Sequence, residues 1–153
     1  MKSAYYTAVV TNAYRHALDE IRSGAKPDPL WVEETEKVSH RPYSTGFYYG
    51  YPGQHYGSAS YTQSADVAAI VESCDEQGNA LLTQRNRIFT GDTLELMNPE
   101  TKPIAFQADK LTDENGNEIQ DTRHPMMRFR MKLPIFVPQY TIIRKPRTTI
   151  SNS

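Results

Sequence analysis

The apolar pattern from Asp66 onward constrains the fold of this 153-residue chain more than any other feature. Short apolar runs that suit β-strands are separated by turn signals, such as Gln77-Gly78-Asn79 and Asn115-Gly116-Asn117. We predict six strands, over residues 67–73, 80–86, 93–97, 104–111, 126–133 and 140–144. This spacing predicts a mainly β fold class, with a small six-stranded closed barrel over residues 66–153.

Residues 1–65 have a different pattern, which predicts two helices and a connector. Ser3 is placed to cap a first helix that ends near Gly24. Asp28 and Pro29 mark the start of a second helix, which runs to about Val38. Residues 40–63 are rich in Tyr, Gly and Pro and predict an ordered connector whose aromatic rings pack between helices and barrel. An alternative is that these rings stack on nucleic-acid bases.

Charge is distributed unevenly along the chain, although the net charge is only −1. Residues 66–121 carry twelve acidic and four basic residues, and no acidic residue follows Asp121. The C-terminal strands are therefore basic, while the strands before them are acidic.

The strand at 126–133 carries the sharpest functional signal. Apolar residues alternate there with Arg128, Arg130 and Lys132, so that the cations are expected on one outer face of the barrel. Such a face suits contacts with phosphate groups. Two other readings are a solvated surface and a clasp onto the acidic strands. The candidate nucleic-acid-binding residues are Arg128, Arg130, Lys132, Arg144 and Lys145, the last two on the assumption that the final strand lies beside this one.

The polar segment at residues 84–87 is a second feature with two readings. Gln84-Arg85-Asn86-Arg87 is rich in hydrogen-bond donors and lies at a strand end. It either fixes the turn that follows or binds a ligand.

No catalytic residue and no metal site is predicted. Cys74 is the only cysteine and has acidic neighbours, which disfavour the thiolate. The four histidines show no metal-type spacing, and the Gly-x-Ser-x-Gly motif of a nucleophile elbow is absent from the sequence. A single cysteine fits a reducing, cytoplasmic compartment, and no apolar run is long enough to predict a membrane span.

Several segments, in order along the chain, resemble the C-terminal part of proteins of the peptidase U32 family. The matching segments are Tyr5-Tyr6, residues 12–15, residues 37–47, residues 84–86, Gly91-Asp92, His124-Pro125 and residues 132–134. The resemblance implies a barrel similar to the second domain of elongation factor Tu. It also implies a large upstream barrel of TIM type that carries the chemistry and an iron–sulfur cluster, with Met1-Lys2-Ser3 similar to the junction that follows it.

The resemblance also sets the expected function. Members of the family have been labelled collagenase-like proteases, and others hydroxylate an anticodon uridine of tRNA. We therefore expect a non-catalytic accessory part of a larger enzyme, which positions tRNA for hydroxylation and has the upstream catalytic domain as its partner. One alternative is a module that binds a polypeptide or collagen-like substrate; another is a part that only stabilises or dimerises the parent protein.

Overall fold

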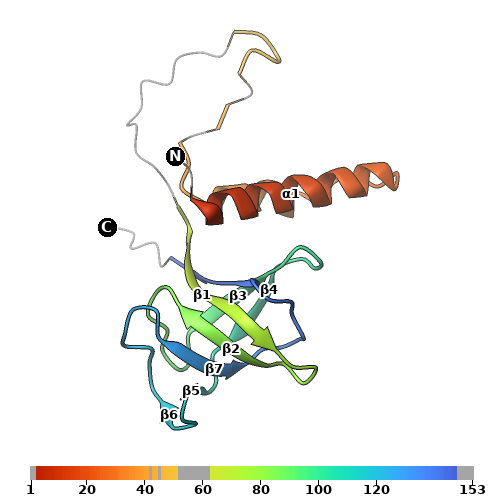
Figure 1. Ribbon diagram of the computed structural model, residues 1–153. Coiled ribbons are helices and arrows are strands. Elements are labelled where there is room, and N and C mark those ends of the chain that lie inside the picture. Colours follow the sequence, from red (N-terminus) through yellow and green to blue (C-terminus); the bar gives the residue numbers. More distant parts are fainter. Residues whose placement is uncertain (1–2, 42, 45, 52–62, 148–153) are drawn as a thin grey trace. The chain divides into compact units, whose positions relative to one another are not determined.

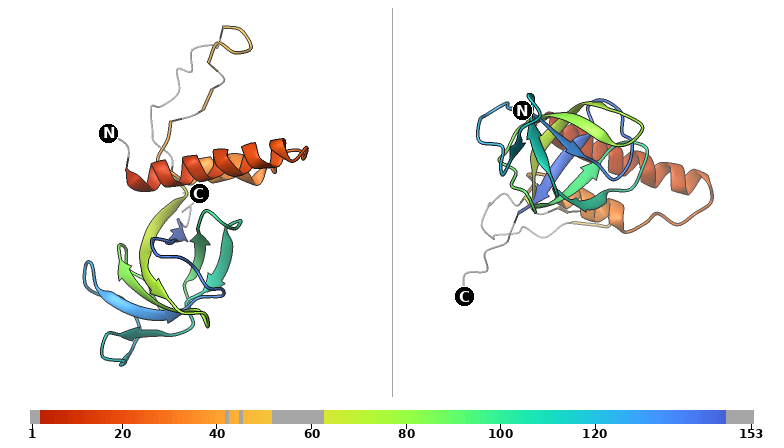
Figure 2. Two further views of the ribbon diagram at one scale, coloured as in Figure 1. Left: turned by 45° about the vertical axis from the view of Figure 1, so that its right-hand side comes forward. Right: turned by 90° about the horizontal axis from the view of Figure 1, so that it is seen from below.

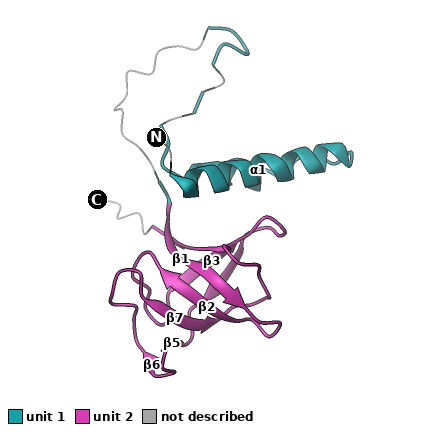
Figure 3. Cartoon of the chain, viewed as in Figure 1, with its two compact units in different colours: residues 1–64 teal, residues 65–153 magenta. Residues whose placement is uncertain are grey.

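The computed structural model describes residues 3–41, 43–44, 46–51 and 63–147 (Figure 1). The chain divides into two compact units, a helical unit of residues 1–64 and a β unit of residues 65–153 (Figure 3). Each unit is described by itself.

The helical unit contains α1 (Ala4–Arg22) and α2 (Leu30–Glu36). The Ser3 hydroxyl accepts a hydrogen bond from the backbone N–H of Tyr6 at 3.1 Å, which is the predicted cap of α1. Asp28 accepts from the backbone N–H of Leu30 at 2.9 Å, so the capping side chain of α2 is also the predicted one. Both helices begin where the sequence indicates, and α2 ends slightly earlier than expected.

Trp31 is a buried packing residue of the helical unit. Its side chain is buried together with Val9 and Ala13 of α1. The indole ring stacks on His16 with a centroid distance of 4.4 Å, and its N–H donates to the Glu20 carboxylate at 3.0 Å. The hydrogen bond to Glu20 therefore satisfies the indole N–H, the one polar group of this large apolar side chain.

The described part of the connector is attached to the helical unit through Tyr43. Its ring stacks on His40 at 4.4 Å, and its hydroxyl donates to the Thr35 carbonyl at 2.9 Å. The rings that follow, those of Phe47, Tyr48, Tyr49 and Tyr51, are exposed. Packing of these rings between helices and barrel stays a prediction, and the remainder of the connector, residues 52–62, lies outside the described residues together with Pro42.

The β unit is one antiparallel sheet of eight strands, so the prediction of six is wrong. The sheet order is β4-β3-β8-β1-β2-β7-β5-β6. The strands are β1 (Ala65–Cys74), β2 (Asn79–Gln84), β3 (Thr93–Met97), β4 (Ile104–Gln107), β5 (Leu111–Asp113), β6 (Glu118–Ile119), β7 (Arg128–Lys132) and β8 (Ile142–Pro146).

The error arises from one long predicted strand and one short hairpin. The chain leaves the sheet at Ala108, whose N–H donates to the Asp92 carbonyl at 3.0 Å and whose carbonyl accepts from Gly91 at 2.8 Å. This interruption divides the predicted strand 104–111 into β4 and the beginning of β5. The predicted turn at Asn115-Gly116-Asn117 then joins β5 to β6. β6 has only two residues, which is too short for a periodic sequence signal.

The sheet curls around a single apolar core (Figure 2). Leu82, Leu94 and Phe129 are fully buried members of this core, drawn from β2, β3 and β7. β4 and β6 are the two end strands, and no strand pairing joins them in the described part of the chain. The curled sheet therefore resembles a half-barrel and not the predicted closed barrel, while similarity to the second domain of elongation factor Tu stays a prediction.

Candidate nucleic-acid interface

β7 has the two faces that its alternating sequence predicts. Phe129 and Met131 are buried, while Arg128, Arg130 and Lys132 are exposed. The strand lies between β2 and β5, which fixes the direction of each side chain. The three cations of this strand therefore share one outer face.

Arg128 is engaged by carboxylates of the same unit. Its guanidinium donates to Glu72 of β1 at 2.7 Å and to Glu114, in the turn between β5 and β6, at 2.8 Å. The hydrogen bonds from Arg128 and Thr83 lower the pKa of Glu72, and Glu72 in turn raises the pKa of Arg128. Arg128 thus clasps β7 to β1 and to the turn between β5 and β6, and a clasp onto the acidic strands was one of the readings left open by the sequence.

Arg144 is not exposed beside the cations of β7, so the expectation that it joins them is wrong. Its side chain is fully buried, and its Nε donates to the Glu95 carboxylate at 2.8 Å. β8 lies in the middle of the sheet between β1 and β3, not beside β7. A strand therefore flanks Arg144 on each side, and its register partner on β3 is Glu95.

Lys145 is also paired, although it remains partly exposed. Its ammonium group lies 2.6 Å from the Asp92 carboxylate and 5.6 Å from the centre of the Phe89 ring. Arg87 covers the same ring at 4.8 Å. These contacts hold Lys145 within its own unit, away from the cations of β7.

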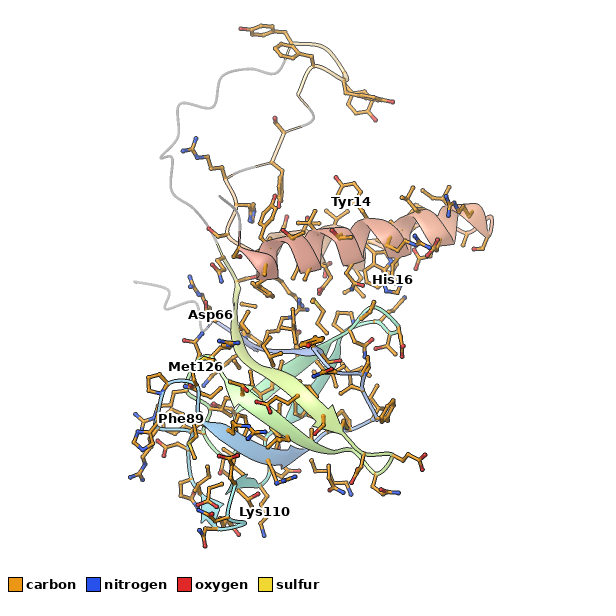
Figure 4. All side chains as sticks on the ribbon, in the orientation of Figure 1. Tyr14, His16, Asp66, Phe89, Lys110 and Met126 are labelled. Atoms are coloured by element: carbon orange, nitrogen blue, oxygen red, sulfur yellow. The ribbon has the colours of Figure 1, made fainter. Side chains whose placement is uncertain are left out.

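Arg130 and Lys132 differ from the other candidates, because neither forms an ion pair with a described residue. Both line a groove of about 770 Å³, which we call the cationic groove. Lys110 lies on the same rim, and its ion-pair partner among the described residues is the exposed carboxylate of Glu118, at 3.2 Å. Figure 4 shows Lys110 at one end of the β unit, well separated from Met126.

The floor of the cationic groove is apolar. Phe106 of β4, Met131 of β7 and Leu133 line it. Phe106 faces the same side of the sheet as buried Leu94, its register partner in β3, yet it is only partly buried. The ring remains accessible because β4 is an end strand of the sheet.

The sequence did not indicate Phe106 or Lys110 as site residues. Both lie within the predicted strand 104–111, where alternation alone gives no reason to single them out. They join Arg130 only because the chain turns away after β4 and returns as β5 beside β7. Asp109-Lys110, the two charged residues of the run 104–111, are the signal that could have located the turn.

The polar segment at residues 84–87 has structural contacts. Asn86 donates to the Val67 carbonyl at 2.7 Å, and the Gln84 side chain accepts from the backbone N–H of Met126 at 3.1 Å. Arg87 donates through Nε to buried Asp121 at 2.7 Å. These bonds tie a loop to three other parts of the β unit, which supports the structural reading of this segment.

The described residues show no group of three or more His, Cys, Asp or Glu side chains arranged to hold a metal ion. Cys74 is a free thiol of intermediate exposure. None of the described helices combines the length and the apolar character needed to cross a bilayer. Of the four histidines, His55 lies outside the described residues.

Comparison with protein families gives two adjoining matches. Residues 63–144 match the model of the peptidase family U32 C-terminal domain, and residues 1–58 match the model of peptidase family U32. The two solved structures compared are crystal structures of the C-terminal domain of a Geobacillus thermoleovorans protein described as a U32 peptidase. One is 33% identical, covers 52% of this chain and 99% of that chain, and has a TM-score of 0.50. The other is 28% identical, covers 54% and 93%, and has a TM-score of 0.51.

Curated relatives carry a consistent name. The chain is 30% identical to tRNA hydroxylation protein P1 of Bacillus subtilis, over 95% of this chain and 36% of the relative. It is 32% identical to tRNA hydroxylation protein P of Escherichia coli, over 75% of this chain and 26% of the relative. The chain therefore spans about a third or less of the length of the curated relatives that it matches.

Proposed function

This chain belongs to peptidase family U32, and from that premise we propose that its β unit positions tRNA for a modification carried out by another part of a larger protein. The names of the curated relatives support tRNA as the substrate class. The observation that carries the proposal is the pair Arg130 and Lys132, two exposed cations on the rim of the cationic groove.

Contacts with phosphates explain how two exposed cations can contribute to RNA binding. A phosphate that replaces solvent beside Arg130 or Lys132 releases condensed counterions, which favours binding at low salt. Arg128, Arg144 and Lys145 already donate to carboxylates, so a phosphate would have to displace those partners first. The RNA-binding role proposed from the sequence is therefore narrowed to Arg130 and Lys132, with Lys110 beside them.

The chemistry is assigned to the part of the protein outside this chain. The iron–sulfur cluster implied by the family resemblance is held by several cysteine thiolates, and this chain contains only Cys74. Its residues do not fit the ligand set of such a cluster. We accordingly assign no catalytic residue to this chain, and its cytoplasmic location stays a prediction.

Titration of the 153-residue chain with tRNA at about 50 mM and about 200 mM salt tests the proposal. The variant R130Q/K132Q is expected to bind about tenfold more weakly at the lower salt, and its salt slope should decrease by about two charges. The variant R22Q/K26Q is the matched control, because it removes two exposed cations from the helical unit. Absence of binding at low salt, or equal binding by both variants, would reject the proposal.

The open edge of β4 supports a second candidate function. An end strand can accept an extended polypeptide as an additional strand, which fits a substrate-binding module of a peptidase. Binding of this kind depends on backbone hydrogen bonds and should change little with salt. Salt-insensitive binding of a polypeptide, in a chain that does not bind tRNA, would favour this candidate.

A further inference from the structure

The cationic groove combines two surfaces of different chemistry. Its rim carries Lys110, Arg130 and Lys132 against a single carboxylate, that of Asp109, while its floor includes Phe106 and Met131. The outer face of β7 provides the cations, and the side of the sheet that faces the core provides the apolar floor. A ligand that fills this groove must therefore present an anionic group and a flat or apolar group close together.

We infer that the cationic groove binds an unpaired nucleotide, with its base against Phe106 and its phosphate beside Arg130 and Lys132. This inference rests on the proposed function and goes further, because it names the form of RNA that is recognised. A base-paired helix presents phosphates and sugars at its surface and keeps its bases stacked inside, so it would use only the rim. An unpaired nucleotide uses the rim and the floor together.

The size of the groove fits this ligand. A volume of about 770 Å³ lies within the range of roughly 300–1,000 Å³ that is usual for sites that bind small molecules. The cavity is lined by one aromatic ring, so it offers stacking to a single base. A run of bases would need a series of such rings, and the groove is therefore assigned to one nucleotide.

The position of Phe106 argues for a ring that is both supported and accessible. One side of the ring packs against the core of the β unit, which limits its movement. The other side lines the groove, because no strand covers the free edge of β4 in the described part of the chain. A ring held in this way can stack on a base with little loss of its own freedom.

Fluorescence anisotropy with the 153-residue chain can separate the two surfaces. The probes are a labelled, mixed-sequence RNA strand of about eight nucleotides, the same strand in a duplex, and a strand of equal length with abasic ribose phosphates. The unaltered chain is expected to bind the single strand about tenfold more tightly than the duplex or the abasic strand. Equal affinity for the single strand and the abasic strand would overturn the inference without any change to the protein.

The variant F106L should lose about tenfold in affinity for the single strand and change little for the duplex. F136L is the matched control, since Phe136 is exposed and does not line the groove. R130Q/K132Q should weaken binding of both RNA forms, because both present phosphates. If tRNA binds but F106L and F136L behave alike, only the unpaired-nucleotide inference fails; if tRNA does not bind, the proposed function fails with it.

Discussion

Gly78 shows how a single residue fixes one end of the cationic groove. Its φ angle is 84°, and a Cβ at this position would lie 2.5 Å from the carbonyl oxygen of Leu133. The backbone N–H of Leu133 donates to the Gly78 carbonyl at 2.8 Å. The turn between β1 and β2 thus holds the segment that follows β7, including Leu133 on the groove floor.

Replacement of this glycine should therefore destabilise the β unit. We expect Gly78→Ala to lower the free energy of unfolding by about 3 kcal/mol, through backbone strain and displacement of Leu133. Gly116→Ala is the control, because Gly116 has a φ of 85° but no atom within 4 Å of the added Cβ. That variant should lose only about 1 kcal/mol. Urea denaturation followed by circular dichroism measures both, and equal losses would contradict the role of the close contact.

At the scale of elements, β8 joins the two halves of the sheet. It pairs with β1 on one side and with β3 on the other, and Arg144 lies buried at this junction. Its ion pair with Glu95 connects β8 to β3 through side chains as well as through the backbone. A buried guanidinium must keep its partner, because an uncompensated charge in the interior is costly.

We expect Arg144→Ala to destabilise the β unit by about 3–5 kcal/mol, since it leaves Glu95 without this partner and creates a cavity. The double variant R144M/E95M should recover most of that loss, because an apolar pair replaces both charges. Urea midpoints of the two variants measure the difference. A double variant as unstable as Arg144→Ala would indicate that the pair stabilises the fold beyond the avoidance of a buried charge.

The sequence predicts long or capped elements well and short ones poorly. Ser3 and Gly24 mark the ends of α1, and alternation identifies β7, because each signal is local. β5 and β6 have three and two residues, which is too few for a period to be recognised. The pairing of Arg144 with Glu95 depends on which strands are neighbours, and alternation within one strand carries no information about that.

For the whole molecule, the uneven charge along the sequence becomes a set of ion pairs. The basic C-terminal strands fold against the acidic strands that precede them, as Arg128 does with Glu72 and Arg147 with Asp66, at 2.7 Å in each case. The sequence therefore predicted a basic segment correctly, but it did not show how many of the cations remain available to bind a ligand. Only the structure shows that Arg130 and Lys132 form no ion pair with a described carboxylate, although the charge of Lys132 helps to lower the pKa of Asp75.

The same contacts predict how stability depends on pH. Four of the described carboxyl groups with lowered pKa values are those of Glu72, Asp75, Asp113 and Asp121. Hydrogen bonds dominate each shift: from Arg128 to Glu72, from Asn79 to Asp75, from Asn117 to Asp113 and from Arg123 to Asp121. A lowered pKa in the folded state stabilises the fold above the ordinary value and loses that effect as pH falls through the lowered one.

The urea midpoint should therefore decrease as the pH falls below about 4, near the ordinary pKa values of these groups. The variant D75N/D113N removes two of the four groups while the side-chain oxygen of each asparagine can still accept from the turn backbone. Its midpoint should change less steeply over the same pH range. An unchanged slope would show that these two turn carboxylates do not contribute to the acid response.

The stack of Trp31 on His16 has a practical consequence for such measurements. Trp31 is the only tryptophan of the chain, and it lies in the helical unit. Its fluorescence is an optical signal confined to one half of the protein, whereas the circular dichroism of strands reports the other half. If the helical unit and the β unit unfold at different urea concentrations, one sample will give two midpoints, one from fluorescence and one from circular dichroism.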